Sequence, residues 1–163
     1  AFGFDILQAF ADWTAETFGF VTPGQEEAEA PQDPYLELRL AVAEETDLPV
    51  VPNWAPNDTI LNGDISVVSR SNSLRLQGIY KIDDGEFTIR IVLYDSLPEE
   101  YSSIYQKNNN LIKEYKLNGV IHYLMENNGA YRAVWTNENA EVLIQGDLST
   151  EDLEKMINSV YKG

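Results

Sequence analysis

The feature that most constrains this fold is an alternation of apolar and polar residues that begins after Gly63 and runs almost to the C-terminal helix. Successive side chains of a β-strand point to opposite faces, so this period of two predicts strands with one buried face. Short turn sequences separate the runs, namely Asp83-Asp84-Gly85, Asn118-Gly119 and Asn128-Gly129. The pattern therefore predicts antiparallel hairpins between strands that are consecutive in the sequence.

The predicted fold class is α+β, with a single antiparallel, meandering β-sheet of about 6–7 strands and helices packed on one face. A C-terminal helix and an N-terminal helical arm complete it. The strands are expected at residues 64–68, 74–82, 86–94, 111–116, 120–126, 131–136 and 141–145.

Three segments show the 3.6-residue spacing of amphipathic helices, at residues 5–18, at residues 34–46 and after Ser149. Ser149 with Asp152 three residues later is typical of a helix N-cap, and the apolar residues that follow fall on one face. Asp33-Pro34 offers the middle helix an N-cap followed by proline at its first position.

The composition divides the chain into three parts. Residues 1–21 form an aromatic helical arm, and residues 22–34 form an acidic linker that is rich in proline and has no large apolar side chain. Residues 35–163 form the α+β domain.

Four aromatic residues are candidates for an interaction surface: Phe10, Trp13 and Phe18 in the arm, and Trp54 in the domain. An aromatic helix face must be buried against its own domain, another copy, a protein partner or a membrane. The arm carries acids and no Lys or Arg, which argues against a lipid surface. Trp54 lies between prolines and is expected either to close one end of the sheet or to line an exposed groove.

The charge restricts the partners. The chain has 27 acidic and 11 basic residues, a net charge of −16. Such a surface is repelled by phosphate backbones and anionic headgroups, so we expect no nucleic acid and no electrostatic membrane docking. A protein partner or self-association remains open. The absence of cysteine does not decide the compartment.

No reactive constellation is visible. With a two-residue turn at Asn128-Gly129, Glu126 falls opposite Tyr131 and His122 opposite Trp135, which could form an acid/base group. No Ser or Cys nucleophile motif accompanies this single histidine, so we interpret it as structural or partly exposed. The acids at the Asp83-Asp84-Gly85 turn lack the ligand spacing of a calcium loop. We therefore predict no catalytic residue, no cofactor and no metal site, and expect a protein that is not an enzyme.

The stretch from Val120 to Tyr161 carries a recognisable pattern: an Asn-Gly hairpin, a strand ending in Trp-Thr-Asn, then Gly-Asp-Leu-Ser and the terminal helix. Trp135, Gly146, Leu148-Ser149 and residues 157–160 carry most of the resemblance, and the Pro52-x-Trp54-x-Pro56 element also fits. The chain resembles the bacterial domain of unknown function 4367, which is found chiefly in Firmicutes at the outer end of single-pass membrane proteins. Some of those relatives look like anti-sigma factors or sigma regulators.

The resemblance implies an extracytoplasmic domain with an interaction or sensing role, held by a membrane anchor upstream of this sequence, and it supplies no catalytic residues. Two alternatives remain open. The curved sheet could be a half-barrel that carries a small apolar ligand or lipopeptide, because its apolar face must be covered by something. The second alternative is a hydrolase that uses His122 or a pair of carboxylates.

Overall fold

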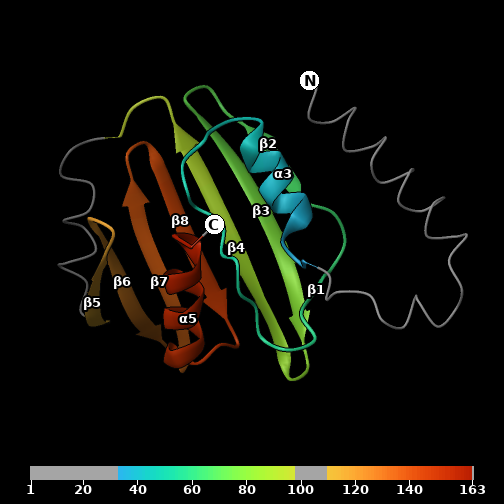
Figure 1. Ribbon diagram of the computed structural model, residues 1–163, viewed down its shortest axis with the longest axis vertical. Coiled ribbons are helices and arrows are strands. Elements are labelled where there is room, and N and C mark those ends of the chain that lie inside the picture. The colour runs from blue at the N-terminus through green and yellow to red at the C-terminus, as the bar shows by residue number, and fades with distance from the viewer. Residues whose placement is uncertain (1–32, 98–109, 163) are drawn as a thin grey trace, which may run out of the picture.

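The computed structural model in Figure 1 describes residues 33–97 and 110–162. One antiparallel sheet of eight strands fills the view, and two helices lie in front of it, α3 (Leu36–Ala43) over β3 and α5 (Thr150–Val160) over β7. The α+β class, the single antiparallel sheet and the C-terminal helix are thus confirmed. Within the described ranges no helix has the length and apolarity to cross a membrane.

The aromatic arm lies outside the described residues, and so do Phe10, Trp13 and Phe18. Of the predicted linker, the last two residues are described. Asp33 lies next to α3 and forms an ion pair with Arg39, with 3.1 Å between the Arg39 Nη2 and Asp33 Oδ2 atoms.

Each predicted strand is present, with ends within two residues of those expected. The strands are β1 (Ile60–Leu61), β2 (Ser66–Ser69), β3 (Ser73–Ile82), β4 (Gly85–Tyr94), β5 (Leu111–Leu117), β6 (Val120–Asn127), β7 (Ala130–Asn137) and β8 (Ala140–Gly146). The additional strand is β1, which is too short to show an alternation in the sequence.

The predicted continuous meander is wrong. The strand order is β1-β3-β4-β8-β7-β6-β5, with β2 also paired to β3. After β4 the chain crosses to the far edge at β5 and returns through three hairpins, so that β8 pairs with β4. Turn residues specify pairing only between strands that they connect, and alternation does not show which strand lies next to β4.

The hairpin turns follow their sequences. Asn118-Gly119 and Asn128-Gly129 have positive φ at both positions, as a type I′ turn requires. The turn at Asn128 places Glu126 opposite Tyr131, as the two-residue loop predicted.

The main core lies on the inner face of the sheet, the face toward the helices. A single cluster joins buried strand residues to buried residues of both helices. Its members include Leu76, Tyr80, Ile89, Ile91, Trp135, Val142 and Ile144 from the sheet, Leu38 and Val42 from α3, and Leu153, Met156 and Ile157 from α5.

The two helix starts differ in their agreement with the sequence. Ser149 caps α5 as predicted, because its hydroxyl accepts a hydrogen bond from the Asp152 backbone N–H at 3.0 Å. The middle helix begins at Leu36 and not at residue 34. The Asp33 carboxylate accepts from the Tyr35 N–H at 3.0 Å, so it closes a turn before the helix and is not the N-cap.

Candidate binding groove

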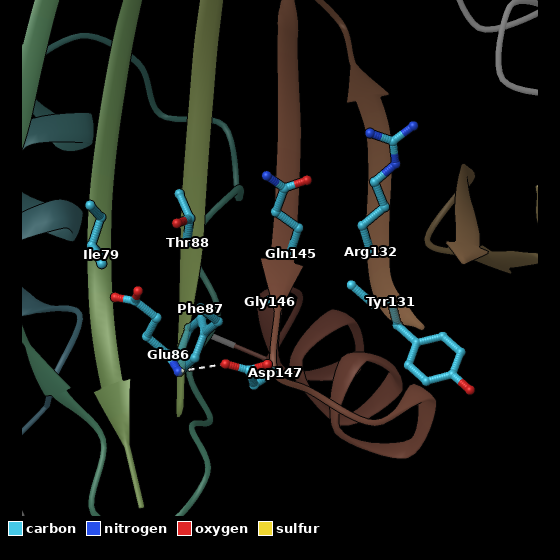
Figure 2. Close-up of a pocket in the computed structure, with 10 residues that line it drawn as sticks. Ile79, Glu86, Phe87, Thr88, Tyr131, Arg132, Gln145, Gly146 and Asp147 are labelled. Carbon is cyan, nitrogen blue, oxygen red and sulfur yellow. Dashed lines mark hydrogen bonds between the residues drawn. The ribbon is translucent and has the colours of Figure 1, made fainter. Parts of the chain in front are cut away.

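The outer face of the sheet, opposite the helices, is built by cross-strand neighbours from four strands. Ile79, Thr88, Gln145 and Arg132 are successive partners across β3, β4, β8 and β7, and Figure 2 shows them side by side. Alternation along each strand directs their side chains away from the core. The row exists because β8 pairs with both β4 and β7.

A depression of about 380 Å³ lies along this row, open to solvent. It is lined by Ile79, Glu86, Phe87, Thr88, Ala130, Tyr131, Arg132, Gln145, Gly146 and Asp147. One end is acidic, because it contains Glu86 and Asp147. The Asp147 carboxylate accepts a hydrogen bond from the Glu86 N–H at 3.0 Å, drawn as a dashed line in Figure 2.

A smaller depression of about 150 Å³ shares Arg132 with the first. It is lined by Arg90, Val92, Arg132, Val134, Glu141 and Leu143. We call the two depressions together the arginine groove. Its floor is apolar over β4, β8 and β7, and a small buried cluster of Tyr123, Met125 and Val134 adjoins it on the same face.

Three of the chain's five arginines, Arg75, Arg90 and Arg132, lie half-buried on this face. The Arg90 Nε donates to the Gln77 side-chain oxygen at 2.9 Å, whereas the Nε atoms of Arg75 and Arg132 are buried and have no hydrogen-bond partner. A buried, unpaired donor costs about 1–3 kcal/mol.

No ion pair in residues 33–97 and 110–162 involves any of these three arginines. The ion pairs join Arg39 to Asp33, Lys113 to Glu154, and Lys155 to Glu151. The acid on the groove wall, Glu141, accepts from the Tyr94 hydroxyl at 3.1 Å. This face therefore holds three arginines that form no ion pair with a described carboxylate, in a chain with a net charge of −16. The carboxylates of Glu86, Glu141 and Asp147 also line its two depressions.

Trp54 is half-buried and packs against the main core, and it also lines a separate groove of about 670 Å³ at the start of α3. The Lys155 ammonium lies 5.3 Å from the centre of its ring, within range of a cation–π contact. The neighbouring Asn53 N–H donates to the Ser159 hydroxyl at 2.8 Å, which attaches the connection to α5.

His122 is fully buried beneath the C-terminal end of α5. Its Nδ1 lies 2.9 Å from the Tyr115 carbonyl oxygen, and its Nε2 lies 2.6 Å from the Tyr161 hydroxyl. A carbonyl can only accept, so Nδ1 carries the proton and Nε2 accepts from Tyr161.

Burial lowers the pKa of His122, opposed in part by its hydrogen bond to the Tyr115 carbonyl. Both ring nitrogens are engaged inside the core, which agrees with a structural histidine. In the part of the chain that the structure describes, no cluster of His, Asp and Glu could hold a metal ion.

Comparison with protein-family models places residues 49–160 in a Domain of unknown function (DUF4367), a match that covers well over half of the chain. The chain belongs to the DUF4367 family. The DUF4367 segment runs from the proline-rich connection through β1 to the end of α5 and leaves α3 outside. No curated protein and no solved structure matches the chain.

The residues that carry the DUF4367 resemblance have structural roles here. Trp135, Leu148, Ile157 and Val160 are buried, and Ser149 caps α5. The motif thus specifies how α5 packs on the sheet.

The arginine groove uses other positions, and sequence reasoning missed it. Arg90 and Arg132 stand at ordinary polar positions of alternating strands, and they come together only because β8 pairs with both β4 and β7. Arg75 lies outside the groove and reaches the same face through the β3–β4 hairpin.

Proposed function

We propose that this DUF4367 chain is a non-enzymatic, extracytoplasmic interaction or sensing domain of a membrane-anchored bacterial protein, with a regulatory role of the anti-sigma type. A protein partner docks on the outer face of the sheet. The observation that carries the proposal is the contrast between the two faces. The inner face joins the two helices in one core, whereas the outer face has an open groove lined by Arg90 and Arg132, neither of which forms an ion pair with a described residue.

The groove has the mixed character of a protein-binding surface. Interfaces are enriched in arginine, and their buried centre is more apolar than the rest of the protein surface. Ile79 is 37% exposed at one side of the groove, and Val92 and Leu143 are half-buried within it. A partner that places carboxylates against the arginines and covers these apolar groups would gain binding free energy from both contacts.

The alternatives receive less support from the described residues. A carrier would need space between sheet and helices, and one continuous core occupies that layer. A hydrolase based on His122 would need the imidazole to face a cleft, and its ring is instead fully buried with both nitrogens bonded.

Docking is tested by photo-cross-linking in cells that express the full-length gene. Gln145 in the groove is replaced by p-benzoylphenylalanine, and the matched control carries the same probe at Asp83, an exposed turn position at the end of β3. A discrete protein adduct from position 145 and none from position 83 supports the proposal. A folded variant that gives no adduct from position 145 contradicts it.

Localisation has its own test. Intact cells that express the full-length gene are treated with protease, and residues 35–163 are followed by immunoblotting. We expect degradation without lysis. A domain that is protected until the cells are lysed would overturn the extracytoplasmic assignment and leave the docking surface to be judged separately.

A further inference from the structure

We propose that the arginine groove binds a short peptide segment of the partner, in which one or two carboxylates stand next to apolar side chains. This inference rests on the proposed docking function and specifies its ligand. The placement of Arg90 and Arg132, the apolar side chains between them and the acids at the two ends of the groove support it.

Arg90 and Arg132 stand on either side of β8, because β4 and β7 are its two neighbours. Neighbouring strands are about 4.8 Å apart, and Arg90 and Arg132 are also offset by two residues along β8, since they pair with Leu143 and Gln145. The two arginine backbones are therefore separated by roughly 12 Å. Each guanidinium presents a planar fork of N–H donors that matches a carboxylate in two parallel hydrogen bonds. The spacing suits one carboxylate held between the two side chains, or one on each.

The apolar side chains between the arginines favour a peptide ligand over a free inorganic anion. Val92, Val134 and Leu143 line the space beside the guanidinium groups. Removing apolar area from water contributes about 25 cal/mol per Å², a gain that a phosphate or sulfate ion cannot supply. Peptide side chains such as Leu or Val next to an acid would supply it.

Neutral groups continue the groove toward β3. Thr88 and Gln145 lie in the same row as Arg132, and Figure 2 shows them between Ile79 and Arg132. A hydroxyl and a primary amide both donate and accept, so they can bond to the N–H and C=O groups of a peptide backbone.

Acids limit how many negative charges the ligand can have. Glu141 lines the groove beside Arg90, and Glu86 with Asp147 lines the opposite end. The net charge of −16 adds a long-range repulsion that grows with the charge of the ligand. A long polyanion is therefore disfavoured, and a segment with its carboxylates confined between these acids is favoured.

The test selects random heptapeptides displayed on phage against the full 163-residue chain, followed by titration of a synthetic peptide with the selected sequence. We expect Asp or Glu beside Leu, Ile or Val. Arg132→Gln and Arg90→Gln, made separately, should each weaken binding at least tenfold, because charge-assisted hydrogen bonds contribute about 1.5–3 kcal/mol. Thermal melts of each variant establish that it is folded.

The matched control is Arg70→Gln, which removes the same charge from an exposed position outside the groove and should leave the affinity within about twofold. A second control replaces each acid of the peptide by its amide, which should abolish binding.

Three results would overturn the inference: no selected peptide above background, selection without acidic enrichment, or binding by both groove variants that is as tight as that of the wild-type chain. Arginine-dependent binding to phosphatidylglycerol vesicles but not to peptides would assign the groove to a membrane surface instead. A cross-link from position 145 to a protein whose binding does not depend on the arginines would leave the docking function standing and refute this ligand.

Discussion

His122 connects three parts of the molecule through one side chain. It lies on β6, donates to the backbone of β5 and accepts from Tyr161 just after α5. Its ring also contacts Trp135 edge-on, with 4.7 Å between the ring centres. The Tyr161 hydroxyl can donate to Nε2 only while Nε2 carries no proton. The stability of the fold therefore depends on the protonation state of His122.

The stability of the chain should therefore fall as pH drops below about 6.5. The pKa of His122 is near 6.5 in the unfolded chain and lower in the folded one, mainly because of burial. Below 6.5 the unfolded state binds a proton that the folded state does not, and each unit of pKa difference contributes about 1.4 kcal/mol. Urea unfolding from about pH 8 to about pH 5.5 measures this.

The matched variant is His122→Gln, whose free energy of unfolding should be lower overall and nearly independent of pH across the same window. A wild-type chain without the slope, or a variant that keeps it, would contradict the assigned role of His122.

Glu138 marks a strained position in the turn between β7 and β8, with φ of +52°. A side chain with a Cβ is disfavoured there by about 1–2 kcal/mol, whereas glycine is not. We expect Glu138→Gly to stabilise the chain by about 0.5–1 kcal/mol, after the entropy of glycine in the unfolded state is subtracted. Glu138→Ala, which removes the same negative charge and keeps the strain, is the control in thermal melts and should gain less.

At the scale of elements, the junction of β8 with α5 decides how the C-terminal helix meets the sheet. Gly146 has φ of +148°, and a Cβ built there would lie 2.5 Å from the Glu86 carbonyl oxygen and from Phe87 Cα. These are backbone atoms of β4, so they cannot move aside without opening the β4–β8 pair. A glycine is required here by close approach as well as by conformation.

Gly146→Ala should accordingly lower the free energy of unfolding by about 2–4 kcal/mol, the sum of overpacking and backbone strain. The control is Gly129→Ala, which also has positive φ but has nothing within 4 Å of the added methyl group. It should cost about 1 kcal/mol. Equal losses in chemical denaturation would show that close approach to β4 is not the cause.

The cap of α5 belongs to the same junction. Ser149→Ala removes the acceptor for the Asp152 N–H and should cost about 1 kcal/mol. Ser149→Asp restores an acceptor and should recover most of the loss in thermal melts. If both variants were equally unstable, the hydroxyl would not be acting as the cap.

The whole molecule carries a large negative charge that few described ion pairs offset. A net charge of −16 opposes the compact state by self-repulsion. Salt shortens the range of that repulsion, from about 30 Å at 0.01 M to about 10 Å at 0.1 M.

Raising the NaCl concentration from about 0.01 M to about 0.1 M should therefore raise the melting temperature by a few degrees at neutral pH. The same salt step near pH 4.2, the isoelectric point, should have little effect because the net charge is then close to zero. A melting temperature that falls with salt at neutral pH would indicate that attractive pairs outweigh the repulsion.

The sequence by itself determined the local structure: the alternating strands, the Asn-Gly turns and the Ser149 cap all depend on neighbours within a few residues, and each was predicted near its observed place. The burial of Trp135 also followed from alternation, whereas the full burial of His122, which was expected to be structural or partly exposed, did not. The tertiary structure decided that β8 pairs with β4, because no short-range signal links strands so far apart in the chain. The arginine groove is a consequence of that pairing, since its two arginines lie on β4 and β7, which are joined only when β8 pairs with both.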